Sequence, residues 1–247
     1  MMACLAAMAG SVAGQASVSP SPPQGQAGQE LDPYAFILSA VDRSLGEARL
    51  YLDMTGWEAV TGREDRLFRT QVWIQGSNLY VESHLNGNLR LSIVADGQKV
   101  WRYDAVANEY TFLSQPGTIG ETLGLAVAWA RNEAQRPLRL LARSPRWLVI
   151  PRSNVEPTFV EVWQTTGEGE KWRGTILQFS FDAPSPDGRM DRLEIVERFD
   201  TGRNGLREAE YTARFSYPAS PFDFEFEFVP PKGAKPAADL PRRIGGG

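Results

Sequence analysis

Apolar and polar residues alternate over much of this chain. The clearest runs lie between Arg66 and Leu113, where Gly, Asn and Asp separate them. Because successive side chains of a strand point to opposite faces, such alternation predicts a meander of antiparallel strands with one apolar face. Asn86-Gly87 predicts a two-residue hairpin turn, because both residues tolerate positive φ. Asp96-Gly97 predicts a second such turn.

The same pattern returns in the second half of the chain. Alternating runs around Phe159, Leu177, Leu193 and Tyr211 predict four further strands. Every second residue over Phe222–Phe228 is Phe, and three carboxylates occupy the positions between them. This segment predicts a last strand with a fixed register, because a slip by one residue would bury the three carboxylates.

Helical spacing replaces the strand pattern in two regions of the chain, which together predict three helices. Asp32 is placed to cap a helix that has Pro at its first position, and apolar residues recur every three or four positions over Pro33–Leu45. Thr118 and Glu121 have the spacing of a capping box before an apolar stripe, which predicts a second helix. Pro137 begins a third, short helix. The last two helices therefore separate two halves of a sheet.

The two ends of the chain differ from the middle in composition. Residues 1–16 carry no charge and end in Gly14-Gln15-Ala16, which predicts a secretory signal segment and a periplasmic or otherwise exported protein. Residues 17–31 are rich in Ser, Pro, Gln and Gly and predict a disordered linker. A single domain is expected over 32–233, followed by a flexible tail at 234–247.

The amino-acid composition argues against several classes of function and of site. The chain has 247 residues, of which 42% are hydrophobic and 23% charged, and its formal net charge is −4. It therefore has no global basic field, so nucleic acid is not an expected partner. One Cys and one His exclude a disulfide framework and a Cys/His zinc site within one chain. Lipidation of Cys4 in a longer precursor stays open, although apolar residues follow it.

The sequence contains no motif that predicts catalysis. It lacks a G-x-S-x-G elbow, a Gly-rich phosphate loop and H-E-x-x-H. In the register above, the single imidazole, His84, points away from the apolar face. The pair Glu225 and Glu227 follows regular alternation, which indicates a solvated strand face. We therefore expect no enzyme, no cofactor, no metal and no catalytic residue.

Four motifs resemble one known family by their order and spacing. They are the segments N-L-Y, V-A-D-G-Q-K-V-W-R-Y-D, R-P-L-R-L-L-A-R and F-E-F-E-F-V-P-P-K-G, at Asn78–Tyr80, Val94–Asp104, Arg136–Arg143 and Phe224–Gly233. Together they are similar to the LolA-like periplasmic lipoprotein carriers, the outer-membrane lipoprotein-sorting superfamily. The resemblance spans roughly Asp32 to Asp239.

This resemblance implies a fold and a function. The fold is β-rich α+β, an incomplete, half-open antiparallel barrel whose helices cover the concave face. The function is non-enzymatic transport by a monomer that binds a lipid or a lipidated protein. Carriers of the family commonly place an Arg-Pro turn before N-L-[FY], and that Arg holds the lid helices closed. This chain has Gln75-Gly76-Ser77 there, so we expect a divergent member without that gating contact.

The expected ligand site is the apolar concave face. Each buried methylene contributes about 0.8 kcal/mol, so an acyl chain of ~16 carbons gains on the order of 10 kcal/mol before ordering costs. The same residues suit a filled core, in which case the fold would serve as an envelope sensor or a module that binds an envelope protein. The candidate residues are Trp73, Leu79, Val81, Leu91, Ile93, Trp101, Tyr103, Leu123, Val127, Phe179 and Phe226.

Overall fold

The computed structural model describes residues 33–131, 148–151, 159–166, 172–183, 188–202 and 205–237. Its helices are α2 (Pro33–Gly46) and α3 (Ile119–Arg131). The strands of the first half are β1 (Arg49–Val60), β2 (Arg66–Gln75), β3 (Asn78–Leu85), β4 (Asn88–Ala95), β5 (Lys99–Asp104) and β6 (Glu109–Ser114). Those of the second half are β7 (Leu148–Pro151), β8 (Phe159–Thr166), β9 (Arg173–Phe181), β10 (Met190–Gly202), β11 (Gly205–Ser216) and β12 (Lys235–Pro236).

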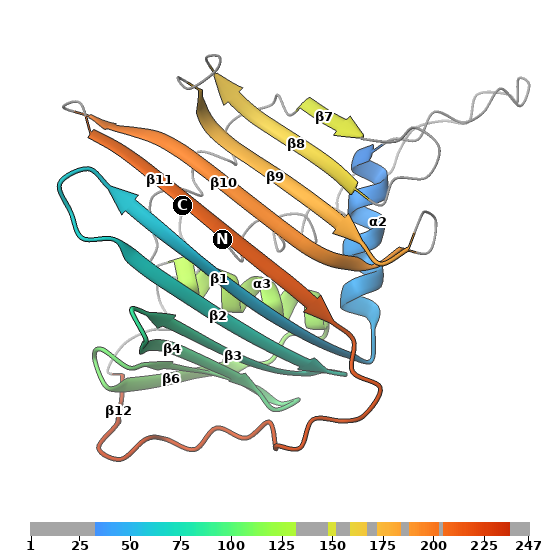
Figure 1. Ribbon diagram of the computed structural model, residues 1–247. Helices are drawn as coiled ribbons and strands as arrows, with labels where there is room; N and C mark the ends of the chain where they lie inside the picture. The colour runs from blue at the N-terminus through green and yellow to red at the C-terminus, as the bar shows by residue number, and fades with distance from the viewer. Residues whose placement is uncertain are drawn as a thin grey trace, which may run out of the picture.

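The described strands form one open sheet (Figure 1). Their order is β12-β6-β5-β4-β3-β2-β1-β11-β10-β9-β8-β7, so the two edges of the sheet do not pair with each other. Neighbours are antiparallel except β12, which runs parallel to β6. Pairing of β1 with β11 joins the two halves in the middle of the sheet. The fold is thus β-rich and unclosed, as the sequence predicted.

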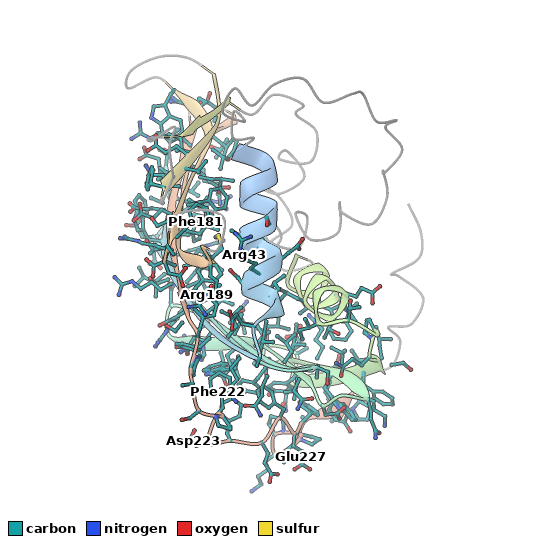
Figure 2. The ribbon with its side chains drawn as sticks, turned by 90° about the vertical axis from the view of Figure 1, so that its right-hand side faces the viewer. Arg43, Phe181, Arg189, Phe222, Asp223 and Glu227 are labelled. Carbon is teal, nitrogen blue, oxygen red and sulfur yellow. The ribbon has the colours of Figure 1, made fainter. Side chains whose placement is uncertain are left out.

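Both described helices lie on one face of the bent sheet (Figure 2), which we call the inner face. Val41 and Leu45 of α2 and Leu123 and Ala126 of α3 are buried in the same apolar cluster as the strand residues. Every second strand residue points into this cluster, because side chains alternate between the faces. The hydrophobic core therefore sits between the inner face and the two helices.

Local signals in the sequence explain how α3 begins. The backbone N–H of Glu121 donates to Oγ1 of Thr118 at 3.2 Å, and the N–H of Thr118 donates to Oε2 of Glu121 at 3.3 Å. These reciprocal bonds are those of a capping box, which satisfies two backbone donors at the helix start. The predicted third helix, which begins at Pro137, lies outside the described residues.

The two predicted hairpin turns have different outcomes. Asn86 and Gly87 have φ values of 50° and 77°, so the tight turn between β3 and β4 is confirmed. At the second turn only Gly97 has positive φ, 91°. Oδ1 of Asp96 accepts from the N–H groups of Gln98 and Lys99 at 2.9 and 2.8 Å. The backbone N–H of Asp96 donates to the carbonyl oxygen of Lys99 at 3.2 Å, so Gly97 and Gln98 are the central residues of the turn, and the predicted centre at Asp96-Gly97 lies one residue too early.

The predicted last strand over Phe222–Phe228 is wrong. This segment is extended but joins no ladder, and it crosses the outer face of the sheet, opposite the helices (Figure 2). We call residues 218–237 the strap. Its start is fixed by Arg49, which donates to the carbonyl oxygens of Pro218 at 3.0 Å and Ala219 at 2.5 Å. Its end is β12, so the expected tail begins with a short strand on β6.

Candidate functional site

Six of the candidate residues gather on the inner face or on α3, which contacts β3 and β4. Their exposed fractions lie between 0% and 5%, so they form a dry apolar layer. Val127 belongs to α3, but its side chain lies outside those described. The six are Leu79, Val81, Leu91, Ile93, Leu123 and Phe179.

The other four candidates lie on the outer face, so the expectation of a single shared face was wrong. Trp73 stands between Val72 and Ile74, which both point into the inner core, and alternation turns it outward. Trp101 likewise follows Val100, an inner residue with no exposed surface. The sequence did not separate the two faces here because both carry large apolar side chains. The four are Trp73, Trp101, Tyr103 and Phe226.

Two of these candidates, Trp73 and Trp101, pack beneath the strap, and Phe226 belongs to the strap itself. The ring of Trp73 lies 5.3 Å from that of Tyr80 and 5.9 Å from that of Phe224. Trp101 stacks on Phe228 with centroids 5.1 Å apart and an interplanar angle of 18°. Such aromatic pairs stabilise a fold beyond the area that they bury. These residues therefore hold the strap to the sheet.

The Gln75-Gly76-Ser77 segment also fastens the strap. Oε1 of Gln75 accepts from the backbone N–H of Phe222 at 3.2 Å. Gly76 has φ of 58° in the turn between β2 and β3, a value that Gly adopts at low cost. The contact made at this position thus holds the C-terminal strap on the outer face.

A charged group lies on the inner face at the end of β1, and the sequence analysis did not single it out. Nη1 of Arg207 lies 2.8 Å from Oε2 of Glu197, and Nε lies 3.3 Å from Oε1 of Glu58. Glu197 continues the inner alternation of Leu193 and Ile195 on β10. That spacing could have revealed it, because a Glu two residues beyond an apolar run falls on the apolar face.

Burial shapes the electrostatics of this group. Exposed fractions of the three side chains are 12% for Arg207, 13% for Glu58 and 5% for Glu197. Burial opposes the charge of Arg207, but the attraction of the two carboxylates outweighs it and raises the pKa of the guanidinium. Burial also raises the pKa of the neighbouring Tyr211 phenol above its usual range. Arg207 is therefore held as a cation, and Tyr211 stays neutral.

A polar pocket of about 570 Å³ lies beside the end of α2. Arg43 donates from Nε and Nη2 to the carbonyl oxygen of Gly188 at 3.1 and 2.8 Å. Arg189 pairs with Asp182 at 2.8 Å and Glu47 at 3.0 Å, and hydrogen bonds with these carboxylates raise the pKa of Arg189. These bonds tie α2 to the β9–β10 connection, and such polar walls do not suit an acyl chain.

Two further properties concern the residues that the structure describes. Within the ranges given above, no three or more His, Cys, Asp or Glu side chains are grouped to hold a metal ion. Neither described helix has the length and apolar character that crossing a membrane requires.

Sequence comparison and structure comparison give different results. No protein-family model and no curated protein matches the sequence. A solved structure of an uncharacterized conserved protein from Thermus thermophilus is similar at 13% identity and a TM-score of 0.41, over 84% of this chain and 99% of that one.

A LolA superfamily protein from Nitrosomonas europaea is similar at 14% identity and a TM-score of 0.35, over 76% of this chain and 94% of that one. The motifs of the sequence had indicated a resemblance to the same superfamily.

Proposed function

We propose that this protein is an exported, non-enzymatic carrier that binds an acyl chain of a lipid or lipidated protein against the inner face of its sheet, beneath the helices that cover the concave side. The observation that carries the proposal is the apolar layer itself: an unclosed sheet buries Val81, Leu91, Ile93 and Phe179 in one cluster with residues of the two described helices. Carrying such a chain requires no reacting group, because burial of methylenes supplies the affinity.

Entry of the chain requires a helix to move, since the apolar layer is buried. α2 is fastened by polar contacts: Oγ of Ser44 accepts from the N–H of Met190 at 2.9 Å, and Arg43 holds the carbonyl oxygen of Gly188. α3 instead contributes Leu123, Ala126 and Trp129 to the core and lies over β3 and β4. Apolar contacts of this kind are replaced by those of an acyl chain at little cost. We therefore assign the moving part to α3.

The experiment is a titration of the purified protein with a fluorescent monoacylglycerol, a neutral ligand with one long chain. We expect saturable binding of one ligand per chain. Leu91→Phe adds volume to the inner layer and should weaken binding, because a packed layer accommodates extra atoms poorly. Leu67→Phe is the matched control, since Leu67 is 62% exposed. Circular dichroism verifies that both variants are folded, and absence of saturable binding to the folded protein rejects the carrier.

One observation favours a second candidate. The inner layer is almost completely buried, with Leu79 and Ile93 fully inaccessible, as in a core that its own side chains fill. On this alternative the protein is an interaction module that recognises an envelope protein. Native mass spectrometry of the protein purified from its host envelope separates the two: a co-purified lipid mass supports the carrier, and a lipid-free mass with a bound protein supports the module.

A further inference from the structure

The inner face ends in a polar row. On β9, β10, β11 and β1 the residues that stand opposite one another are Thr175, Glu197, Ala209 and Glu58. The neighbouring row on the side of Leu177 and Ile195 is apolar, whereas the row on the other side carries Arg207 between Phe199 and Val60. Glu58 lies six positions along β1 from Leu52 in the middle of the layer, which is about 20 Å at the rise of a strand. This distance is comparable to the length of a long acyl chain.

The donors of Arg207 are all engaged, whereas the acceptors of Glu58 and Glu197 are used only in part. Arg207 places Nη1 and Nε on the two carboxylates, and its Nη2 lies 3.4 Å from Oε2 of Glu58 and 3.4 Å from the hydroxyl of Tyr211. Each ionised carboxylate has about four lone-pair positions, so one guanidinium leaves several free. One cation between two anions also leaves a net negative charge in a largely buried place, which is costly without a further cation.

Thr175 gives an independent indication of a ligand. It has no exposed surface, and its Oγ1 has no hydrogen-bond partner among the described residues. It stands directly opposite Glu197 on the inner face. Buried hydroxyls almost always have a partner, so an unpartnered one beside spare carboxylate oxygens indicates a group that comes from outside the fold.

We propose that this row binds the primary ammonium of an amine-bearing lipid headgroup, while the acyl chain follows the apolar rows toward the helices. The inference rests on the carrier function proposed above and adds the chemical class of the headgroup. An ammonium brings three N–H donors and one positive charge, which match the spare acceptors and the net charge of the row. Glu58 and Glu197 accept hydrogen bonds from two of its N–H groups, and the Thr175 hydroxyl oxygen accepts one from the third.

The test compares lysophosphatidylethanolamine with lysophosphatidylglycerol, both with the same acyl chain, by isothermal titration calorimetry. The complex with lysophosphatidylethanolamine has one more charge-assisted hydrogen bond than the complex with lysophosphatidylglycerol. We therefore expect its affinity to be higher by about tenfold or above. Glu197→Gln keeps the shape but removes a charge, and the preference should fall to about threefold or below. Thr175→Val removes the hydroxyl alone and should lower it to a smaller extent. Glu194→Gln, on the outer side of β10, is the matched control and should keep the full preference.

The outcomes separate the two proposals. If the neutral monoacylglycerol binds and the two charged lipids bind equally, the headgroup inference is wrong and the acyl-chain proposal stands. If the amine preference survives in Glu197→Gln, the row does not hold the headgroup. If no acyl ligand binds the folded protein, the carrier proposal fails and the headgroup inference fails with it. If Glu197→Gln does not fold, the ratio of the affinities for the two charged lipids is measured in Thr175→Val instead. An unchanged ratio in that variant rejects the headgroup inference.

Discussion

A Cβ atom on Gly56 would stand 2.2 Å from Cδ1 of Tyr211, its partner across the β1–β11 pair. The tyrosine ring therefore lies directly over the glycine, and no larger residue fits there without moving the ring. Tyr211 is itself buried between Arg207 and the ring of Phe68, whose centroid is 6.0 Å away. This contact joins the two halves of the sheet.

Gly56→Ala should destabilise the fold because the new methyl must displace the Tyr211 ring. The cost of such overpacking is about 1 to 3 kcal/mol. Equilibrium unfolding in urea measures it as a lower midpoint with an unchanged slope. Gly124→Ala is the control: a Cβ at Gly124 of α3 meets nothing within 4 Å, and Ala stabilises a helix interior by about 0.5 to 1 kcal/mol over Gly. Equal midpoints for the two variants would refute the packing argument.

The sequence predicted most of the fold because the relevant signals are local. Alternation placed the strands, and Asn86-Gly87 and the Thr118 capping box fixed a turn and a helix start. The strap was misread because alternation reports which side of an extended segment is buried, not whether its backbone joins a ladder. Phe226 is buried at 8% exposure and Glu225 is exposed, as in a strand, but the burial comes from packing on the outer face.

The candidate site was predicted in part, for a similar reason. Leu79, Ile93 and Phe179 lie within uninterrupted alternation, and their face follows from it. Trp73 and Trp101 lie in strands that are apolar on both faces, so alternation separates the two sides of each strand but does not tell which side meets the helices and which the strap. The long-range contacts of the strap span over a hundred residues of sequence, and no local pattern encodes them.

Arg207→Leu should destabilise the protein strongly. It leaves Glu58 and Glu197 buried without their cation, and breaking such a buried pair costs about 3 to 5 kcal/mol. Arg198→Leu is the control, because its 2.8 Å pair with Glu208 is near the surface, with exposed fractions of 32% and 35%. Exposed pairs contribute up to about 1 kcal/mol. Thermal and urea unfolding at neutral pH compare the two, and similar losses would show that the buried group is not structurally important.

Phe226→Ala should release the strap while the sheet stays folded. The Phe226 ring lies 5.0 Å from that of Phe224 and 6.2 Å from that of Phe222, so its loss opens a hole among the strap aromatics. We expect the free energy of local opening to fall by about 2 to 4 kcal/mol. Hydrogen exchange over residues 218–237 measures it, and Glu225→Ala, at an exposed position, should leave exchange unchanged. Faster exchange throughout β1 and β11 would mean instead that the strap and the sheet unfold as one unit.

Stability should decline in alkali because buried tyrosines resist ionisation. Burial raises the pKa of Tyr217 to about 12, with the charges of Asp182 and Glu47 adding to the shift, and its hydroxyl donates to the carbonyl oxygen of Met190 at 2.5 Å. Burial likewise raises the pKa of Tyr80 to about 12.

A raised phenol pKa favours the neutral form in the folded state. Its contribution is complete below the unfolded pKa of about 10 and is lost as the pH rises through the folded value. Unfolding midpoints should therefore fall between about pH 10 and pH 12. Tyr217→Phe should lower the midpoint at pH 7, because Met190 loses its donor, but should make the alkaline decline shallower, with Tyr80 and Tyr211 still contributing. A decline of equal slope in both proteins would show that Tyr217 ionises as readily in the folded chain as in the unfolded one.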